Sequence, residues 1–312
     1  MIFTYVLLAL ISFLLVFVVF PSIVLFFVIF SKKKNVYIEN YKFKGTYIEP
    51  YEELMKNEAA KLRENDSSEV KITAYDGAVL TGQYFDKGFK RTAVFFHGFC
   101  SDPFTNFSAQ ANDLIENGFN ILFVHQRGHV GSGGRFAGLG LLEQNDVLSW
   151  TAFVKNDLGA EEILIYGTSM GCAAVSYASS KIDEPAVKML ILDCGFTSPW
   201  DQMIFGSSQK KIKVAQLAMP LIRLWAKLIV GVDIKKKVTE SLGKNRIPSV
   251  FIHGEADSTV SAAQGLANYE SCASEKTKIF VPGAEHAISY VTDREHVKGL
   301  ILEKIKIYFE RD

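Results

Sequence analysis

Six short, continuous runs of apolar residues constrain the fold of this chain more than any other feature of its sequence. Such runs are typical of parallel strands buried on both faces, whereas a strand with one wet face alternates apolar and polar residues. Segments with apolar residues at helical spacing lie between the runs. The runs are Ala93–Phe96, Ile121–Val124, Ile163–Tyr166, Met189–Leu192, Val250–Ile252 and Ile279–Val281, and the helical segments cover residues 104–117, 141–156, 170–181, 262–273 and 293–309. This alternation predicts an α/β fold with a mostly parallel, doubly wound sheet.

Two further segments are expected ahead of the parallel strands. Residues 69–75 and 79–85 alternate apolar and polar positions around a turn-forming Asp-Gly pair, which predicts an N-terminal β-hairpin. The stretch before the hairpin, residues 32–68, predicts a connector with one polar helix at about Pro50–Arg63. The α/β domain is therefore expected to cover residues 69–312.

A helical cap is expected where the strand–helix alternation lapses. The connection between the fourth and fifth apolar runs is too long for a simple crossover. It contains a helical, apolar stretch, Val214–Val230, bordered by lysine-rich sequence at residues 209–213 and 234–237. We expect an inserted cap at about residues 196–247. Its lysines either face water around a lid with an apolar inner face, or touch an anionic membrane surface.

The first thirty residues carry no charge and about 26 apolar side chains. Because roughly 20 apolar residues span the hydrocarbon core of a bilayer, residues 1–31 predict one transmembrane anchor, tilted or kinked at Pro21. A cleaved signal peptide is disfavoured because the segment lacks a charged n-region and no small-residue cleavage site precedes Ser31. A buried core helix is disfavoured because an uncharged stretch of this length is difficult to bury in one soluble domain.

The flanking charges predict how the anchor is oriented. No Lys or Arg precedes the apolar segment, and five lysines follow it: Lys32, Lys33, Lys34, Lys42 and Lys44. The positive-inside bias then predicts a single-pass membrane protein with the bulk of the chain in the cytoplasm. The four cysteines have no regular spacing, which suits a reducing compartment.

The overall charge excludes one class of partner. The 312 residues include 34 basic and 34 acidic side chains, so the formal net charge is zero. A nucleic-acid binder is expected to carry a strong basic field, and none is present. No nucleic-acid partner is expected.

The segment Gly167-Thr168-Ser169-Met170-Gly171 has the form G-x-S-x-G and lies where a predicted strand ends and a predicted helix begins. On such a turn the serine is strained in a way that lifts its Oγ clear of the sheet, and the glycines remove side chains that would collide. The pattern alone leaves an ordinary glycine-rich turn equally open. Ser169 is therefore a candidate nucleophile that needs a base nearby.

A serine hydroxyl needs a base, and the base needs a carboxylate that orients it. Asp257 comes soon after the strand predicted at Val250–Ile252, and His286 comes soon after the strand predicted at Ile279–Val281. The carboxyl ends of parallel strands lie along one edge of a sheet, so these residues converge there. The order serine, aspartate, histidine is that of the α/β-hydrolase architecture. We predict a catalytic triad of Ser169, Asp257 and His286.

Other residues compete for the same roles. Asp193 is the main rival acid because it also follows a strand. Glu255 is weaker because it lies nearer the strand, and Glu285 is expected to face solvent. His253 is expected to be structural, and His296 is expected to lie on the surface of the last helix.

An oxyanion hole requires two backbone N–H groups that point at the developing negative charge. His97-Gly98-Phe99 follows the strand predicted at Ala93–Phe96, so the N–H of Phe99 can pair with that of Met170. A metal role for His97 is disfavoured because no second metal-binding motif accompanies it. The glycine-rich stretch Gly128–Gly140 lacks the Gly-Lys-Ser/Thr ending of a phosphate loop, and we expect a flexible loop near the site. No cofactor and no metal are expected.

From about Glu69 onward the chain resembles an α/β-hydrolase, and more narrowly the serine-aminopeptidase-like bacterial hydrolases, which are often anchored by an N-terminal helix. The narrower resemblance rests on Asp76-Gly77, His97-Gly98-Phe99, Arg127-Gly128 with Gly131-Ser132-Gly133-Gly134, Gly167 to Gly171, Asp193 with Phe196-Thr197-Ser198-Pro199, and His253-Gly254 through Asp257. One departure is that His125-Gln126 stands where the family often has an aspartate before Arg-Gly. That departure affects how the loop is anchored and leaves the triad intact.

The resemblance implies a membrane-anchored serine hydrolase without a cofactor, which cleaves a carboxylic ester of a small molecule or a lipid through an acyl-enzyme. In that reaction Ser169 is the nucleophile, His286 is the base and then the acid, and Asp257 orients His286. Similar proteins include esterases, lipases, thioesterases and acyltransferases, so peptide cleavage, thioester cleavage and acyl transfer stay open. A non-catalytic binding protein that retains the fold is the alternative from another class.

Overall fold

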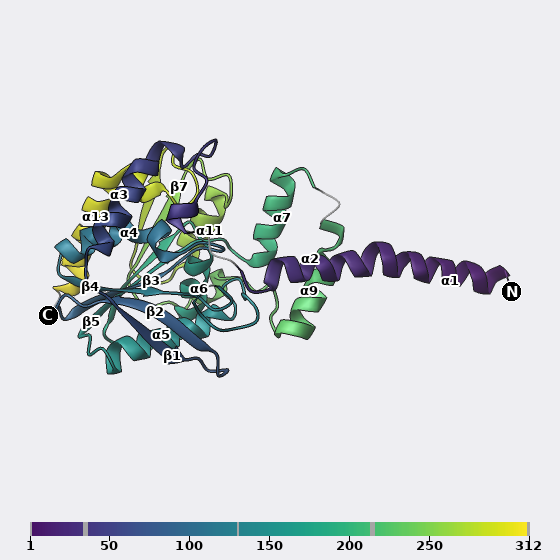
Figure 1. Cartoon of the computed structure of the whole chain (residues 1–312), viewed down its shortest axis with the longest axis horizontal. Helices are drawn as coiled ribbons and strands as arrows, with labels where there is room; N and C mark the ends of the chain where they lie inside the picture. Colours follow the sequence, from purple (N-terminus) through teal and green to yellow (C-terminus); the bar gives the residue numbers. More distant parts are fainter. Residues whose placement is uncertain (1, 34–36, 130, 213–215, 311–312) are drawn as a thin grey trace.

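An eight-stranded β-sheet forms the centre of the molecule (Figure 1). The structure is a computed structural model that describes residues 2–33, 37–129, 131–212 and 216–310. The strands are β1 (Ser68–Thr73), β2 (Val79–Phe85), β3 (Arg91–Phe96), β4 (Phe119–Val124), β5 (Glu162–Thr168), β6 (Val187–Asp193), β7 (Ser249–Gly254) and β8 (Lys276–Val281). Their order in the sheet is β1-β2-β4-β3-β5-β6-β7-β8, and every pair from β4 to β8 is parallel. The predicted mostly parallel sheet is confirmed.

The N-terminal hairpin extends this sheet at one edge. Strands β1 and β2 pair antiparallel, with Thr73 opposite Val79, and β2 continues antiparallel onto β4. The burial of β1 alternates, as expected for an edge strand with one wet face, whereas every residue of β4 is buried. This contrast is why the interior strands read as continuous apolar runs in the sequence.

Helices cover both faces of the sheet. One face packs α4 (Pro103–Glu116) and α13 (Arg294–Phe309) over a core that includes Phe95, Phe123 and Tyr166. The other face packs α5 (Glu143–Asn156) and α6 (Met170–Ala178) over a core that includes Trp150. The remaining elements of the domain are α10 (Thr239–Leu242), α11 (Ala262–Ser271) and α12 (Ser289–Thr292). In the connector, 3-10 turns at Ile38–Asn40 and Glu49–Tyr51 precede α3 (Glu52–Arg63), which packs on α4.

The N-terminal segment consists of three consecutive helical elements, and it projects from the domain (Figure 1). These are α1 (Ile2–Leu14), a π-helical turn (Leu15–Val19) and α2 (Phe20–Phe30). Pro21 explains the interruption, because proline has no N–H to donate to the preceding turn. The Ser22 hydroxyl donates to the carbonyl of Val19 at 2.7 Å and so occupies one of the acceptors left there.

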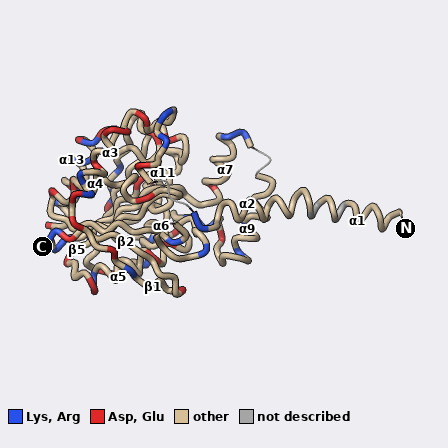
Figure 2. Tube along the Cα trace, in the orientation of Figure 1, with Lys and Arg blue, Asp and Glu red and all other residues tan. Residues whose placement is uncertain are grey.

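Among the described residues, no single helix combines the length and the apolar character that crossing a membrane requires. The predicted single transmembrane helix over residues 1–31 is therefore not supported, and the physical reason is the break of the helix at the π-helical turn before Pro21. Figure 2 shows that α1 and α2 carry no charged residue along their length.

Two helices of the predicted cap lie on either side of α2 in the view of Figure 1, and the second of them along the chain packs on α2. They are α7 (Pro199–Gln209) and α9 (Met219–Trp225), and a π-helical turn at Ala226–Val230 follows α9. The Trp225 indole N–H donates to the Ser22 hydroxyl of α2 at 3.0 Å. Lys34, Lys213 and Val214, which belong to the predicted basic and cap segments, lie outside the described residues.

The end of α2 joins the domain directly. Ser31 forms an antiparallel bridge with Phe136, and the amide of Ala137 donates to the carbonyl of Phe30 at 2.8 Å. The side chains of Phe26 and Phe30 are fully buried. The C-terminal half of the apolar segment is thus packed into the protein, whereas α1 projects beyond the cap helices (Figure 1).

Candidate active site

Ser169 lies on a sharp turn between β5 and α6. Its φ of 54° and ψ of −113° lie in a region that non-glycine residues rarely adopt. The turn packs this closely because its two glycines carry no side chain, and the structure leaves no room for one. A Cβ on Gly167 would lie 2.5 Å from the carbonyl oxygen of Gly171, and a Cβ on Gly171 would lie 1.8 Å from that of Phe96. The packing therefore requires the G-x-S-x-G pattern and presents Ser169 at the end of β5.

The structure brings the three predicted triad residues together. The distance from the Ser169 Oγ to the His286 Nε2 is 2.9 Å, and the distance from the His286 Nδ1 to the Asp257 Oδ2 is 2.7 Å. His286 follows β8, and Asp257 follows β7. Because the carboxyl ends of these parallel strands lie at the same edge of the sheet as the end of β5, both residues lie beside Ser169. In this arrangement the Nδ1–H donates to the carboxylate, and the Nε2 is free to accept the serine proton.

Asp257 is held ionised by its hydrogen bonds. Its Oδ1 accepts from the amides of Thr259 at 2.8 Å and Val260 at 2.7 Å. Burial opposes ionisation, but hydrogen bonds from His253 and His286 outweigh it and lower the pKa of Asp257 to about 2. The carboxylate is therefore charged at any pH at which the protein is expected to work.

His253 is a second histidine beside the same carboxylate. Its Nε2 lies 2.9 Å from the carbonyl oxygen of Val260 and 3.4 Å from the Asp257 Oδ2. Burial lowers the pKa of His253, but the hydrogen bond to Asp257 and the one to Val260 raise it further than burial lowers it. The sequence suggested a structural histidine, and the structure adds that this residue fixes the turn that carries Asp257. The only feature of the sequence that could have indicated this role is the four-residue spacing between His253 and Asp257.

Asp193, the rival acid, is buried at the end of β6 without contact to a histidine. Its Oδ2 accepts from the Tyr166 hydroxyl at 3.3 Å, and its Oδ1 has no hydrogen-bond partner among the described residues. Burial raises the pKa of Asp193 to about 6. Of the other rivals, Glu285 accepts from the amide and hydroxyl of Ser258, and Glu255 and His296 are exposed. The geometry favours Asp257 over all of them.

The loop after β3 presents the predicted oxyanion donors. The amides of Phe99 and Met170 make no hydrogen bond within the part of the chain that the structure describes. The residues on either side of Phe99 are fixed, because the amide of Gly98 donates to the Asn106 Oδ1 at 2.8 Å and that of Cys100 donates to the His129 Nε2 at 3.1 Å. Burial lowers the pKa of His129 to about 4, so its Nε2 is an acceptor at neutral pH. Asn106 and His129 are positioning residues that no sequence motif indicated.

The His97 side chain anchors this loop through both of its ring nitrogens. Its Nδ1 lies 2.7 Å from the carbonyl oxygen of Gly98, and its Nε2 accepts from the amide of Gln126 at 3.2 Å. The Gln126 side chain also donates to the carbonyl of His97. Gln126 occupies the position where the family often has an aspartate, so a neutral amide here does the anchoring.

Buried ion pairs hold the glycine-rich loop in place. The Arg127 guanidinium binds Asp146 through two nitrogens, each at 2.6 Å, and also pairs with Asp76 at 2.7 Å. The carboxylate of Glu143 accepts from the amides of Gly138 and Gly140 at 2.6 and 2.8 Å. Burial raises the pKa of Glu143 to about 7. The predicted proximity of this loop to the site is confirmed, since Leu139 lines the same cavity as Ser169.

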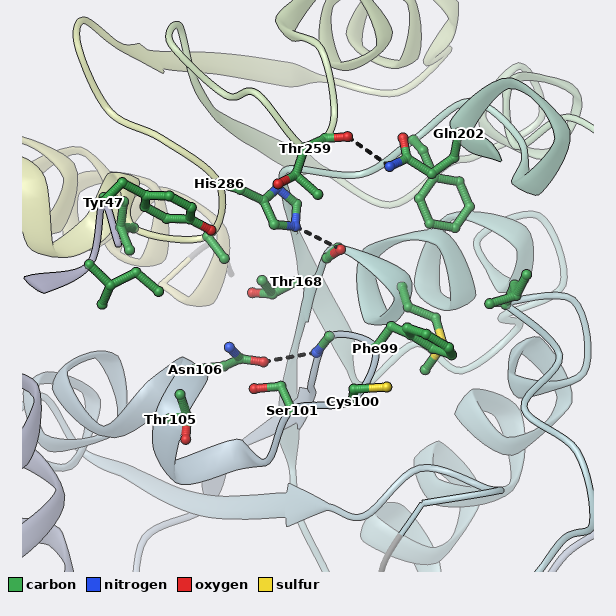
Figure 3. A pocket seen from close by; sticks show the side chains of 18 of the residues that line it. Tyr47, Phe99, Cys100, Ser101, Thr105, Asn106, Thr168, Gln202, Thr259 and His286 are labelled. Carbon is green, nitrogen blue, oxygen red and sulfur yellow. Dashed lines mark hydrogen bonds between the residues drawn. The ribbon is translucent and has the colours of Figure 1, made fainter. Parts of the chain in front are cut away.

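A cavity of about 610 Å³ opens over Ser169 and His286 (Figure 3). That volume lies within the range of small-molecule sites, roughly 300–1,000 Å³. Figure 3 shows the labelled polar groups of Thr168, Asn106 and Ser101 near the reactive residues. Residues of α2, of the connector and of the cap helix α7 also line the cavity.

One group of side chains has a spacing compatible with a metal ion, namely Cys194, Asp257 and His286. Its chemistry does not suit a metal. Asp257 and His286 already bond to each other, and burial keeps the pKa of the Cys194 thiol well above its usual value, so no thiolate is available.

Comparison with known proteins relates the chain to hydrolases. Residues 88–231 match the model of the family described as serine aminopeptidase, S33. The Bacillus subtilis protein YqkD, described as uncharacterized, is 24% identical over 193 residues, and the match covers 61% of this chain and 63% of that relative, less than two thirds of its length. The Salmonella typhi protein YfhR, also described as uncharacterized, is 24% identical over 246 residues, which cover 71% of this chain and 75% of the relative.

Solved structures with the same architecture include esterases. One from Pyrococcus furiosus has a TM-score of 0.65 at 20% identity and is matched over 78% of this chain and 92% of its own. Another, from Exiguobacterium antarcticum, has a TM-score of 0.57 at 18% identity, over 76% of this chain and 99% of its own. At these identities the likeness carries the fold alone, and it confirms the fold that the sequence resemblance implied.

Proposed function

The chain is an α/β-hydrolase of the serine aminopeptidase (S33) type, and on that premise we propose that it is an esterase whose nucleophile is Ser169. The supporting observation is the continuous chain of hydrogen bonds from Ser169 through His286 to Asp257, at 2.9 and 2.7 Å. A serine, a base and an orienting carboxylate in this geometry are the parts that acyl transfer requires.

The reaction begins when the Ser169 Oγ attacks the ester carbonyl carbon and the His286 Nε2 takes the serine proton. Asp257 stabilises the imidazolium that forms. The amides of Phe99 and Met170 donate to the carbonyl oxygen as it becomes negative. The C–O bond to the alcohol then breaks, and the alcohol leaves with the proton from His286. A water molecule, activated by the same histidine, hydrolyses the acyl-enzyme.

The cavity supports an ester rather than a peptide with a free amino terminus. Among the described residues that line it there is no Asp or Glu, and Lys210 is the one charged side chain. An aminopeptidase substrate would leave its ammonium group there without a carboxylate partner, which costs free energy. An uncharged ester has no such group to pair.

Labelling by a fluorophosphonate probe tests the nucleophile. We expect the full chain to be labelled and Ser169→Ala to be unlabelled, and hydrolysis of p-nitrophenyl acetate to fall by at least about 10³-fold in the same variant. Ser101→Ala is the matched control, because Ser101 lines the same cavity but has no base beside it. Labelling that persists without Ser169 would refute the assignment, and a wild-type chain without labelling or hydrolysis would favour a binding protein.

We also propose that the N-terminal segment holds the enzyme at a membrane, with the catalytic domain on the cytoplasmic side. The exposed side chains of α1 support this, because Ile2, Phe3 and Leu8 are more than half exposed to solvent and all are apolar. The lysines that follow, Lys32 and Lys33 among them, support the side.

Cell fractionation tests this placement. The full chain is expected in the membrane fraction, and the double variant Leu8→Lys with Val16→Lys is expected to shift to the soluble fraction. Ile307→Lys, an apolar-to-charged change on the last helix of the domain, is the control that keeps the distribution unchanged. A double variant that stays with the membrane would contradict the proposal, as would protease digestion of the domain from outside intact cells.

A further inference from the structure

Helix α2 is part of the wall of the catalytic cavity. Val28 and Ile29 of α2 line the same space as Ser169 and His286, although roughly 140 residues separate α2 from the serine in the sequence. A segment that only tethered the domain would have no reason to line this cavity.

Contacts on the other side of α2 fix this wall in place. Phe26 and Phe30 are fully buried, and the Phe26 ring centroid lies 6.1 Å from that of Phe136 in the glycine-rich loop. The hydrogen bond from Trp225 to Ser22 joins α2 to the cap, and the bridge at Ser31 joins it to the loop. The position of Ile29 relative to Ser169 is therefore set by packing, as substrate-binding residues require.

The part of the cavity beside α2 is apolar. Ile29 packs in the same hydrophobic core as Leu139 of the glycine-rich loop and Phe196 and Met203 of the cap segment, and all of these residues line the cavity. Val28 lines the cavity and yet is 63% exposed, so the cavity is open to the outside at this point of α2. The exposed apolar side chain of Val24, one helical turn earlier, continues the same flank of the helix away from the domain.

We propose that α2 is one side of an acyl-chain site and that the substrates are esters of long-chain fatty acids, whose chains enter beside Val28 and pack against Ile29. This proposal rests on the esterase function proposed above and names its substrate class. Each methylene that the site removes from water contributes enough to raise kcat/KM about fourfold, until the cavity is filled. The carbonyl then lies at Ser169, and the chain extends toward the apolar segment of the protein.

A series of p-nitrophenyl esters from acetate through octanoate to palmitate tests the proposal on the full chain, in detergent and below saturating substrate. The wild-type chain is expected to show kcat/KM rising with acyl length. Ile29→Trp, which fills the proposed site, is expected to lower the octanoate-to-acetate ratio of kcat/KM by about tenfold or more. Val24→Trp adds the same side chain to the same helix outside the cavity, and we expect its ratio to match the wild type.

The two proposals fail in different ways. If no ester is hydrolysed, the esterase function is wrong and the acyl site with it. If acetate is hydrolysed in a Ser169-dependent reaction but the rate does not rise with acyl length, only the acyl site is wrong. A ratio that is equal in Ile29→Trp and wild type, or lowered equally in Val24→Trp, would also overturn the role of α2. Ile29→Ala provides a second variant, which is expected to shift the preference toward bulkier acyl groups.

Discussion

Two buried aspartates lie at the ends of neighbouring parallel strands, and they differ in the hydrogen-bond donors that surround them. Asp193 ends β6 and Asp257 follows β7, and both are screened from solvent. Asp257 accepts hydrogen bonds from two backbone amides and faces two histidines. Asp193 accepts one from a tyrosine hydroxyl at 3.3 Å, and its other oxygen has no partner within the described part of the chain. The pKa of Asp257 is about 2 and that of Asp193 is about 6.

The difference teaches that burial alone does not decide the state of a carboxyl group. Burial raises the pKa of both groups, and the donors around Asp257 reverse the direction. A permanent charge beside His286 is what catalysis needs, because it selects the tautomer whose Nε2 accepts the serine proton. Among the described residues, Asp193 makes no hydrogen bond to His286, so it does not select the tautomer.

The largest expected effect separates the two residues by activity. Asp257→Asn is expected to lower kcat for p-nitrophenyl acetate by about 10³–10⁴-fold, because an amide allows the wrong histidine tautomer. Asp193→Asn, which has the same change in charge and shape, is expected to stay within about tenfold of wild type. Steady-state kinetics of the two variants make the comparison, and similar losses in both would remove the distinction between the two carboxylates.

An intermediate effect concerns stability and pH. The pKa of Asp193 is raised in the folded chain, so its contribution to stability is complete below the unfolded value near 4 and is lost as pH rises through about 6. Asp193→Asn is therefore expected to gain stability over wild type between pH 4 and pH 8, on the order of 3 kcal/mol. Thermal unfolding followed by circular dichroism at several pH values measures it. An unchanged difference across that range would contradict the buried charge.

The smallest effect sharpens the role of His253. His253→Phe keeps a ring of similar size but removes the hydrogen bonds to Val260 and Asp257, and we expect kcat to fall about tenfold with little change in KM. His253→Gln restores a side-chain N–H and is expected to recover part of the loss. A variant as active as wild type would mean that the backbone amides of Thr259 and Val260 suffice to hold Asp257.

Much of this site could be predicted from the sequence because its parts follow strands. The runs at Ile163–Tyr166, Val250–Ile252 and Ile279–Val281 located the ends of β5, β7 and β8 within a few residues. Once the strands are parallel, the residues after them meet at one edge. Ser169, Asp257 and His286 were named on that ground, and the structure places them within hydrogen-bonding distance.

What could not be predicted depends on contacts between distant segments. No local pattern indicates that Asn106 accepts from Gly98, or that Ile29 lines the cavity of a serine far along the chain. The apolar run at the N-terminus predicted one membrane-spanning helix, tilted or kinked at Pro21, whereas a π-helical turn interrupts it before Pro21 and Phe26 is buried against the domain. The composition of a segment shows how apolar it is, but the residues that pack against it come from distant parts of the sequence and cannot be identified from the segment alone.

The joint at Ser31 has a geometric consequence. Because Ser31 pairs with Phe136 directly after α2, and Lys32 continues with a hydrogen bond to the carbonyl of Arg135 at 3.1 Å, no free linker separates the helix from the domain. The domain cannot swivel about the helix without breaking these bonds. Binding of α1 to any surface would therefore also fix the orientation of the opening beside Val28 and its distance from that surface.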